Sequence, residues 1–213
     1  IVEYTINMPV LHILSDITEH DIDILGFACY IWNIEMTLHV VDMVKAVRPD
    51  IKIVLGGPEV SFTADELLTR CPNIDYIVQG EGEEAFHALV TALHLGNDGL
   101  DPVIPGVRGR RDGSILGSTE AVEVRDLSTI PFPYTEADME DLEHKIIYYE
   151  SSRGCPFSCQ YCLSGNKNTV RFFPQERTLK ELEWFIDHGV KQVKFVDRTF
   201  NCAPHHHRPL MEF

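Results

Sequence analysis

The order of apolar runs between residues 23 and 95 constrains the fold more than any other feature of the sequence. Three runs of strand length contain few polar residues, as expected of buried parallel strands: Asp23–Cys29, Ile51–Leu55 and Ile74–Val78. Amphipathic segments of helix length follow them, after Asn33, over Ala64–Arg70 and over Glu84–Leu95. Because strand and helix alternate with short links, we predict an α/β fold with a doubly wound parallel sheet.

The loops that follow these strands are expected at one edge of the sheet. Right-handed crossovers bring the carboxyl ends of parallel strands together, and folds of this kind bind ligands there. The loops are Ala28–Asn33, Gly56–Glu59 and Gly80–Glu83. Their glycines would let the backbone approach a ligand, although ordinary strand-to-helix turns also use glycine.

Shorter patterns predict the flanking segments. Residues 1–7 alternate like a strand, and a short helix is expected over Val10–His20. The pair Asp112-Gly113 predicts a hairpin within residues 102–118. Residues 119–145 carry 8 acidic and 2 basic side chains, which indicates a linker with a helix over Glu136–Glu143. We therefore expect a first domain over residues 1–97, a hairpin and acidic linker over 98–144, and a second domain over 145–213.

A further strand–helix unit is expected after the linker. Lys145–Glu150 and Gln192–Val196 have strand patterns, and Thr178 is expected to cap a helix over Leu179–His188. Strand, loop, helix and strand form the opening unit of a barrel of the TIM type, whose reactive groups lie at the carboxyl ends of the strands. The segment 151–162 and Asp197 both follow such ends.

The segment 151–162 holds three of the six cysteines, Cys155, Cys159 and Cys162, in the spacing Cys-x3-Cys-x2-Cys. Gly154 and Pro156 disfavour a regular helix, so an irregular loop can direct the three thiols toward one centre. Thiolates suit iron–sulfur clusters, zinc and copper(I). A structural zinc site usually takes four protein ligands, and the sequence has no second Cys-x2-Cys pair. We expect a four-iron cluster with one open iron; zinc or three incidental thiols are the alternatives.

These cysteines resemble the signature of the radical S-adenosylmethionine (SAM) superfamily, Cys-x3-Cys-x-aromatic-Cys, with Tyr161 at the aromatic position. The resemblance implies that the three cysteines hold a 4Fe–4S cluster, that SAM binds the open iron, and that SAM is cleaved reductively to a 5′-deoxyadenosyl radical. It also implies a small-molecule substrate and an electron donor such as flavodoxin or ferredoxin. Tyr161 is expected to help seat SAM.

The residues after the second barrel strand depart from this superfamily's usual pattern. A segment like Gly-Gly-Glu often stands there to hold the amino group of SAM, whereas this chain has Asp197 and Arg198. Asp197 is the candidate for that role, and Arg198 for neutralising a carboxylate or capping a helix, with plain surface positions as the alternative. Cys202 is expected to be a free thiol, and His205–His207 an exposed loop rather than a metal site.

Two short stretches, LGGPE at residues 55–59 and QGEGE at 79–83, resemble the cobalamin-binding domain at the N-terminus of many radical SAM enzymes. The likeness extends over residues 1–95. It implies that cobalamin is a cofactor, and that methyl transfer or rearrangement is the outcome. The implied cobalamin contacts are Tyr30, Asn33, Gly56, Gly57, Pro58, Glu59, Gly80, Glu81, Gly82 and Glu83.

The sequence also departs from other cobalamin proteins. It lacks an Asp-x-His-x-x-Gly motif, so bound cobalamin would have no lower axial histidine. His12, His20 and His39 fall on or beside predicted helices, and His87 and His94 are expected at the surface. A fold of this kind normally opens with one more strand and helix, and the barrel needs further strands. We therefore expect a chain that is truncated at both ends.

The net charge of −15 is unevenly distributed. Residues 1–150 carry 9 basic and 27 acidic side chains, a balance of −18, whereas residues 151–213 carry 9 and 6, a balance of +3. So acidic a first part argues against nucleic acid or an anionic membrane as a partner. An RNA methylthiotransferase would also need a second cysteine triad upstream, where only Cys29 and Cys71 occur, both expected in the core.

The location of the protein is expected from two features. No apolar run reaches the roughly 18 residues of a membrane span, and the N-terminus lacks a basic region followed by an apolar one. Free thiols suited to a metal centre also favour a reducing compartment. We therefore expect a cytoplasmic protein.

Overall fold

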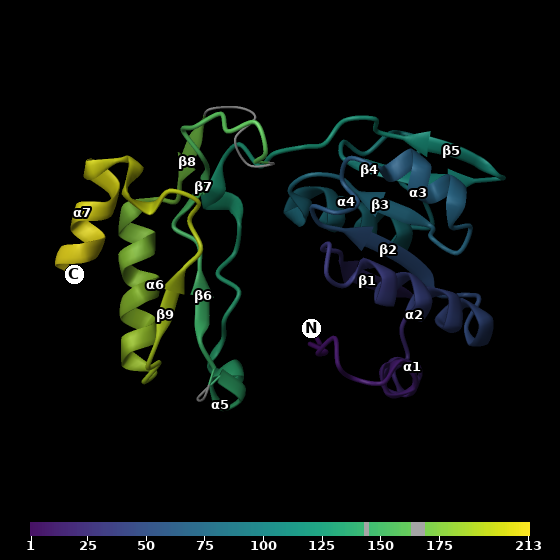
Figure 1. Cartoon of the computed structure of the whole chain (residues 1–213), viewed down its shortest axis with the longest axis horizontal. Coiled ribbons are helices and arrows are strands. Elements are labelled where there is room, and N and C mark those ends of the chain that lie inside the picture. Colours follow the sequence, from purple (N-terminus) through teal and green to yellow (C-terminus); the bar gives the residue numbers. More distant parts are fainter. Residues whose placement is uncertain (143–144, 163–168) are drawn as a thin grey trace. The chain divides into compact units, whose positions relative to one another are not determined.

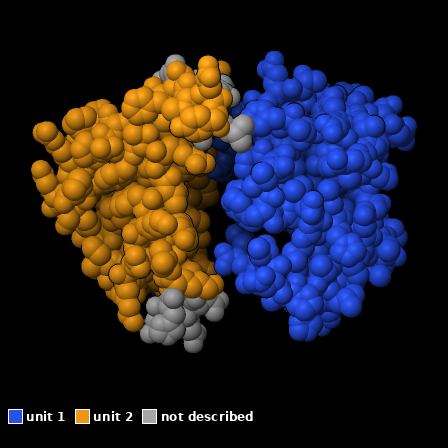
Figure 2. Space-filling view, viewed as in Figure 1, with its two compact units in different colours: residues 1–124 blue, residues 125–213 orange. Residues whose placement is uncertain are grey.

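The computed structural model of the chain describes residues 1–142, 145–162 and 169–213 (Figure 1). These residues form two compact units, residues 1–124 and residues 125–213 (Figure 2). The predicted hairpin therefore lies in the first unit. The domain boundary predicted at residues 144 and 145 falls beside residues 143–144, and these two, like the end of the helix predicted over Glu136–Glu143, lie outside the described residues.

The first unit is built on one five-stranded sheet whose order follows the sequence. Its strands are β1 (Ile24–Ala28), β2 (Lys52–Gly56), β3 (Tyr76–Val78), β4 (Val107–Arg111) and β5 (Ser114–Gly117). The first three are parallel, with Gly26 opposite Val54 and Leu55 opposite Ile77. The last two are the predicted hairpin, which continues the sheet in the antiparallel sense. The sheet is thus mostly parallel, as predicted.

Helices cover both faces of this sheet. They are α1 (Val10–Glu19), α2 (Ile34–Val47), α3 (Ala64–Arg70) and α4 (Gly82–His94). Successive strand residues point to opposite faces. Ile53 and Leu55 pack in one core with buried residues of α1, α2 and α3, whereas Val54 packs in a second core with Ala85 and Leu89 of α4. This division of the core is the doubly wound arrangement that the sequence predicts.

The prediction of a strand over residues 1–7 is wrong. Residues 1–5 have no regular structure, and a turn leads from them into α1. A strand requires a neighbour that completes its ladder of hydrogen bonds. Within the described residues, β1 pairs only with β2, and residues 1–7 do not pair with its open edge. Their alternating pattern alone therefore does not produce a strand.

The hairpin turn has the backbone that its sequence predicts. Asp112 and Gly113 adopt φ angles of 50° and 78°. Positive φ at both central residues is typical of the two-residue turn that matches the twist of a hairpin, and glycine and aspartate accept it readily. The turn sets the register of the last two strands, with Arg111 opposite Ser114.

The second unit contains a strand–helix–strand arrangement. Strands β6 (Ile147–Tyr149) and β9 (Val193–Phe195) are parallel, and α6 (Gln175–Asp187) lies between them in the chain. An antiparallel pair, β7 (Ser152–Gly154) and β8 (Val170–Phe172), flanks the cysteine segment. The other elements of the described residues are η1 (Leu127–Thr129), η2 (Glu136–Asp138), α5 (Met139–Leu142), η4 (Phe200–Cys202) and α7 (Pro204–Glu212).

Helix α6 begins earlier than predicted. Pro174 occupies the N-cap position, and Thr178 lies one turn inside the helix, where it is fully buried. Its hydroxyl donates to the carbonyl of Pro174 at 3.3 Å, a bond within the helix rather than a cap. Phe185 of this helix packs with Ile147 and Tyr149 in the core of the unit.

No helix in the described ranges is long and apolar enough to cross a membrane.

Candidate functional site

The three predicted loops follow β1, β2 and β3 and are joined by hydrogen bonds. The backbone N–H of Cys29 donates to the carbonyl of Gly56 at 2.7 Å, and the N–H of Glu59 donates to the carbonyl of Cys29 at 3.3 Å. These two bonds fix the first loop to the second. Because the strands are parallel, all three loops lie at the carboxyl edge of the sheet, where doubly wound folds bind ligands.

Ser61 joins the second loop to the third, and no sequence pattern singled it out. Its side chain is almost completely buried. The hydroxyl donates to the carbonyl of Gly57 at 2.8 Å and accepts from the N–H of Gly80 at 3.0 Å. A single serine thus satisfies backbone groups of two loops that are about twenty residues apart in sequence. Its only signal in the sequence is its position shortly after the second loop.

Two loop glycines are required by close contacts within the protein itself. A Cβ atom on Gly57 would lie 2.6 Å from the carbonyl oxygen of Cys29, and one on Gly80 would lie 2.2 Å from that of Val122. Both residues also have positive φ, 106° and 84°. Neighbouring backbone therefore explains these two glycines. Gly56 and Gly82 have room for a Cβ in ordinary contact, so their backbone is not crowded.

Asn33 stabilises the first loop from within. Its Nδ2 donates to the carbonyl of Ala28 at 2.9 Å, and its Oδ1 accepts from the N–H of Tyr30 at 2.7 Å. Although Asn33 occupies the N-cap position of α2, its side chain makes no capping bond to the helix. Glu81 is similarly occupied, because its Oε2 accepts from the N–H of Val124 at 2.8 Å.

The first loop carries an exposed aromatic pair. The rings of Tyr30 and Trp32 are stacked, with centroids 4.7 Å apart and planes within 4° of parallel. Trp32 is 66% exposed and Ile31, between them, is 77% exposed. Large apolar side chains gathered on a loop are a sign of a binding surface. Sequence analysis named Tyr30 but missed Trp32 and Ile31, which carry most of this exposed area.

The other predicted loop residues and histidines are placed as follows. Pro58, Gly80 and Glu83 are exposed, and Gly56, Gly57, Glu59, Glu81 and Gly82 are half-buried. His87 and His94 are exposed on α4, as predicted. His12 lies on α1, His20 directly after it, and His39 on α2. Within the described residues, none of these histidines belongs to the three loops.

The three cysteines lie in the chain between β7 and β8, and β7 begins three residues after the end of β6. Gly154, at the end of β7, has φ of 103°, and a Cβ there would lie 2.2 Å from the carbonyl oxygen of Thr169. The N–H of Cys162 donates to the carbonyl of Cys159 at 3.0 Å, which closes a turn between two of the thiols. Cys159 is exposed, and Tyr161 is 93% exposed.

The chemistry of the three thiols suits a cluster, but their arrangement does not gather them. All three cysteines are free. Among the described residues, no group of three His, Cys, Asp or Glu side chains is placed to hold a metal ion. Residues 163–168, directly after Cys162, lie outside the described part. The shared cluster site of Cys155, Cys159 and Cys162 therefore stays a prediction.

The cysteines differ in their acidity. The Thr199 hydroxyl, 3.4 Å from the Cys155 sulfur, and then the Phe157 backbone N–H lower the pKa of the Cys155 thiol. Burial instead raises the pKa of Cys29 to about 12 and raises that of Cys202. Metals bind the thiolate form. The Cys155 thiol is thus more readily ionised than an ordinary cysteine, whereas Cys29 has the environment of a buried core residue.

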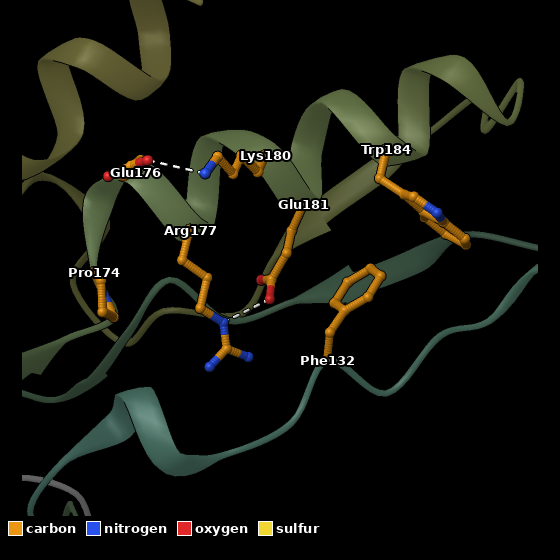
Figure 3. A pocket seen from close by; sticks show the side chains of 7 residues that line it. All are labelled: Phe132, Pro174, Glu176, Arg177, Lys180, Glu181 and Trp184. Carbon is orange, nitrogen blue, oxygen red and sulfur yellow. Dashed lines mark hydrogen bonds and ion pairs between the residues drawn. The ribbon is translucent and has the colours of Figure 1, made fainter.

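A cavity of about 450 Å³ in the second unit lies along α6 (Figure 3). Its charged residues are paired with one another. Arg177 donates to Glu181 at 2.6 Å, and Lys180 pairs with Glu176 at 2.9 Å. Glu181 also accepts from the Tyr149 hydroxyl at 2.5 Å. In Figure 3, the ring of Phe132 lies beside Glu181 and Trp184. Because its polar groups already have partners, this cavity is a weaker candidate site than the loops at the strand ends.

Comparison with known proteins gives matches in both units. Residues 1–90 match the family model of the B12 binding domain. The chain is 32% identical over 206 residues to the cobalamin-dependent radical SAM methyltransferase TokK of Streptomyces tokunonensis, a match that covers 92% of this chain and 30% of TokK. It is also 32% identical to 2-(S-pantetheinyl)-carbapenam-3-carboxylate methyltransferase of Streptantibioticus cattleyicolor, over 86% of this chain and 28% of that enzyme.

A solved structure shares the fold. It is OxsB, a cobalamin-dependent SAM radical enzyme solved with aqua-cobalamin and SAM bound. The TM-score is 0.73 at 20% identity, over 94% of this chain and 29% of OxsB. The chain thus spans about 30% of the length of the relatives that it matches. With residues 1–90 as its B12-binding domain, the chain belongs to the radical SAM proteins that carry an N-terminal cobalamin-binding domain.

Proposed function

We propose that this chain provides the cobalamin-binding domain and the first part of the barrel of a radical SAM enzyme that uses a 4Fe–4S cluster and cobalamin. Methyl transfer is the favoured reaction, because the two relatives described above are methyltransferases by name. The observation that carries the proposal is the position of the three cysteines. They follow β6, the first strand of a parallel strand–helix–strand unit, with the short strand β7 in between. Barrel enzymes place reactive groups beyond the carboxyl ends of such parallel strands.

Each part of the chain has a separate task under this proposal. Cys155, Cys159 and Cys162 would bind three irons and leave the fourth open for SAM, and Tyr161 would line the SAM site. When bound, the cluster and cobalamin supply the one-electron and methyl-transfer chemistry. The protein residues bind and orient these groups and exclude water from them. Rearrangement is the alternative outcome, and the substrate is a small molecule.

The loops of the first unit fit a large flat ligand. The stacked pair of Tyr30 and Trp32 presents an exposed aromatic surface, and the uncrowded backbone at Gly56 and Gly82 can approach a ligand. The hydrogen bonds through Ser61 and Cys29 hold the loops in place before a ligand binds, which lowers the entropic cost of binding. Cobalamin bound here would have no axial histidine from the loops.

Anaerobic reconstitution of the chain tests the cluster part of the proposal. We expect about four irons and four sulfides per chain, with broad absorption in the visible. A chain that takes up zinc but no iron would be a zinc-stabilised binding module instead. The second assay uses a longer form of the protein, matched in length to its relatives, and supplies SAM. If that form holds the cluster but produces no 5′-deoxyadenosine from SAM, the protein is an iron–sulfur module without catalysis.

Replacing Trp32 by alanine tests the cobalamin part. The exposed ring contributes stacking area to the loop surface, so we expect hydroxocobalamin to bind about three- to tenfold more weakly. Because Trp32 is exposed, the free energy of unfolding should change little. Leu95→Ala is a matched control, since Leu95 is 70% exposed but lies after the carboxyl end of α4, away from the loops. Equal affinity for Trp32→Ala and the unaltered chain would contradict this role.

A further inference from the structure

Side chains from three separate segments of the second unit meet at the base of the cysteine segment. Ser151 lies between β6 and β7, Asp197 follows β9, and His206 lies on α7. The Ser151 hydroxyl is 2.7 Å from Asp197 Oδ1 and 2.9 Å from His206 Nε2, and the Ser151 N–H donates to Asp197 Oδ2 at 3.1 Å. Ser151 is completely buried and His206 is 3% exposed. Ser152 also donates its hydroxyl to Asp197 Oδ1 at 2.5 Å.

The chemistry of these groups fixes the direction of each hydrogen bond. An ionised carboxylate only accepts, so both serine hydroxyls donate to Asp197. The Ser151 proton is then used, and its oxygen can only accept from His206, which must carry its proton on Nε2. Burial lowers the pKa of His206, which favours the neutral ring that such a tautomer requires. The donor and the acceptor of each of these hydrogen bonds are therefore defined.

The same cluster reaches both arms of the hairpin that carries the cysteines. Ser152 begins the first arm, β7, and Ser151 directly precedes it. On the second arm, the ring of His206 packs against Phe172 of β8 with centroids 4.5 Å apart. Two residues beyond Asp197, the hydroxyl of Thr199 contacts the sulfur of Cys155. The residues after β9 thus hold the hairpin at its base and touch the first of the three thiols.

Asp197 is half-buried, so hydrogen bonds must offset the hydration that its carboxylate has lost. Asp197 accepts three such bonds, two on Oδ1 and one on Oδ2, which occupy most of its roughly four lone-pair sites. Three accepted hydrogen bonds are hard to explain if Asp197 has no role beyond a plain surface position, which was the alternative in the sequence analysis. They are explained if the carboxylate holds the cysteine hairpin.

We propose that Asp197, Ser151 and His206 are positioning residues, which fix the base of the cysteine hairpin to the carboxyl ends of β6 and β9 and thereby set the position of Cys155. Their importance for cluster binding rests on the proposed function, whereas their hold on the hairpin does not. Asp197→Asn removes the charge and places an amide nitrogen against a donor. His206→Ala removes the ring, and His206→Gln retains a nitrogen donor at the position of Nε2.

Hydrogen–deuterium exchange of the full chain without cluster is the primary test. In Asp197→Asn and His206→Ala, we expect peptides covering residues 150–155 to exchange about tenfold faster, as the loss of a buried hydrogen bond predicts. His206→Gln should restore slow exchange. His207→Ala is the matched control, because the Nδ1 of His207 bonds to the Ala203 carbonyl at the start of its own helix. Unchanged exchange at 150–155, or an equal acceleration throughout residues 125–213, would overturn the proposal.

Iron content after anaerobic reconstitution separates this inference from the proposed function. If the unaltered chain binds no iron, the proposed function fails, and exchange alone decides on the positioning role. If the unaltered chain binds a cluster, we expect Asp197→Asn and His206→Ala to hold less than half as much iron, with His206→Gln close to the unaltered chain. Full iron content together with unchanged exchange in all variants would overturn the positioning role and leave the proposed function intact.

Discussion

Cys159→Ala is expected to abolish cluster binding, with iron falling from about four per chain to below one after anaerobic reconstitution. Two remaining thiolates cannot hold a four-iron cluster that already lacks a fourth protein ligand. Cys159 suits this test because it is exposed, so its removal opens no cavity in the core. Iron and acid-labile sulfide analysis gives the result, and circular dichroism confirms that the variant is folded.

Cys202→Ala is the matched control for this experiment. Cys202 is a free, half-buried thiol of the same unit, and it lies outside the spacing of the other three thiols. The Cys202→Ala variant should bind as much iron as the unaltered chain. The assignment of ligands would be contradicted if Cys159→Ala kept its iron, or if Cys202→Ala lost iron to the same extent.

Gly80→Ala is expected to destabilise the first unit by about 2 to 5 kcal/mol. Two effects add at this position. An L side chain is disfavoured at φ of 84°, and its Cβ would lie 2.2 Å from the Val122 carbonyl, a backbone atom that cannot rotate away. The displacement would also break the bond from the Gly80 N–H to Ser61. Urea denaturation followed by circular dichroism measures the change.

Gly96→Ala separates the two effects. Gly96 has φ of 79°, close to that of Gly80, but nothing lies within 4 Å of the position of its Cβ. Gly96→Ala should therefore lower the free energy of unfolding only by the backbone strain, about 1 to 2 kcal/mol. Equal losses for the two variants would show that the contact with Val122 contributes nothing, and that the third loop is not held by close backbone packing.

Local sequence patterns predicted the elements that are determined by residues close together in the sequence. The runs at Ile51–Leu55 and Ile74–Val78 became β2 and β3, because continuous apolar residues suit strands buried on both faces. The pair Asp112-Gly113 predicted its turn because few residues accept positive φ. In these cases the residue type and its neighbours in sequence determine the structure.

Features that depend on distant partners were not predictable. Residues 1–7 have the alternating side-chain pattern of a strand, but among the described residues no strand pairs with them. Ser61 and His206 are polar residues in segments without an apolar pattern, yet each is buried by contacts with residues 19 and 55 positions away. His206 was expected in an exposed loop, but α7 carries it into the base of the cysteine hairpin. Only the fold shows which polar residues meet.

The Mössbauer spectrum of the chain loaded with ⁵⁷Fe tests the central claim most directly. Three cysteine ligands leave one iron of a 4Fe–4S cluster without a thiolate. Binding of SAM should therefore alter the Mössbauer signal of about one iron in four and leave the signals of the other irons unchanged. We expect a spectrum that separates into components of about three to one when SAM is added. Four equivalent irons that do not respond to SAM, or a chain that binds zinc in place of iron, would contradict the account.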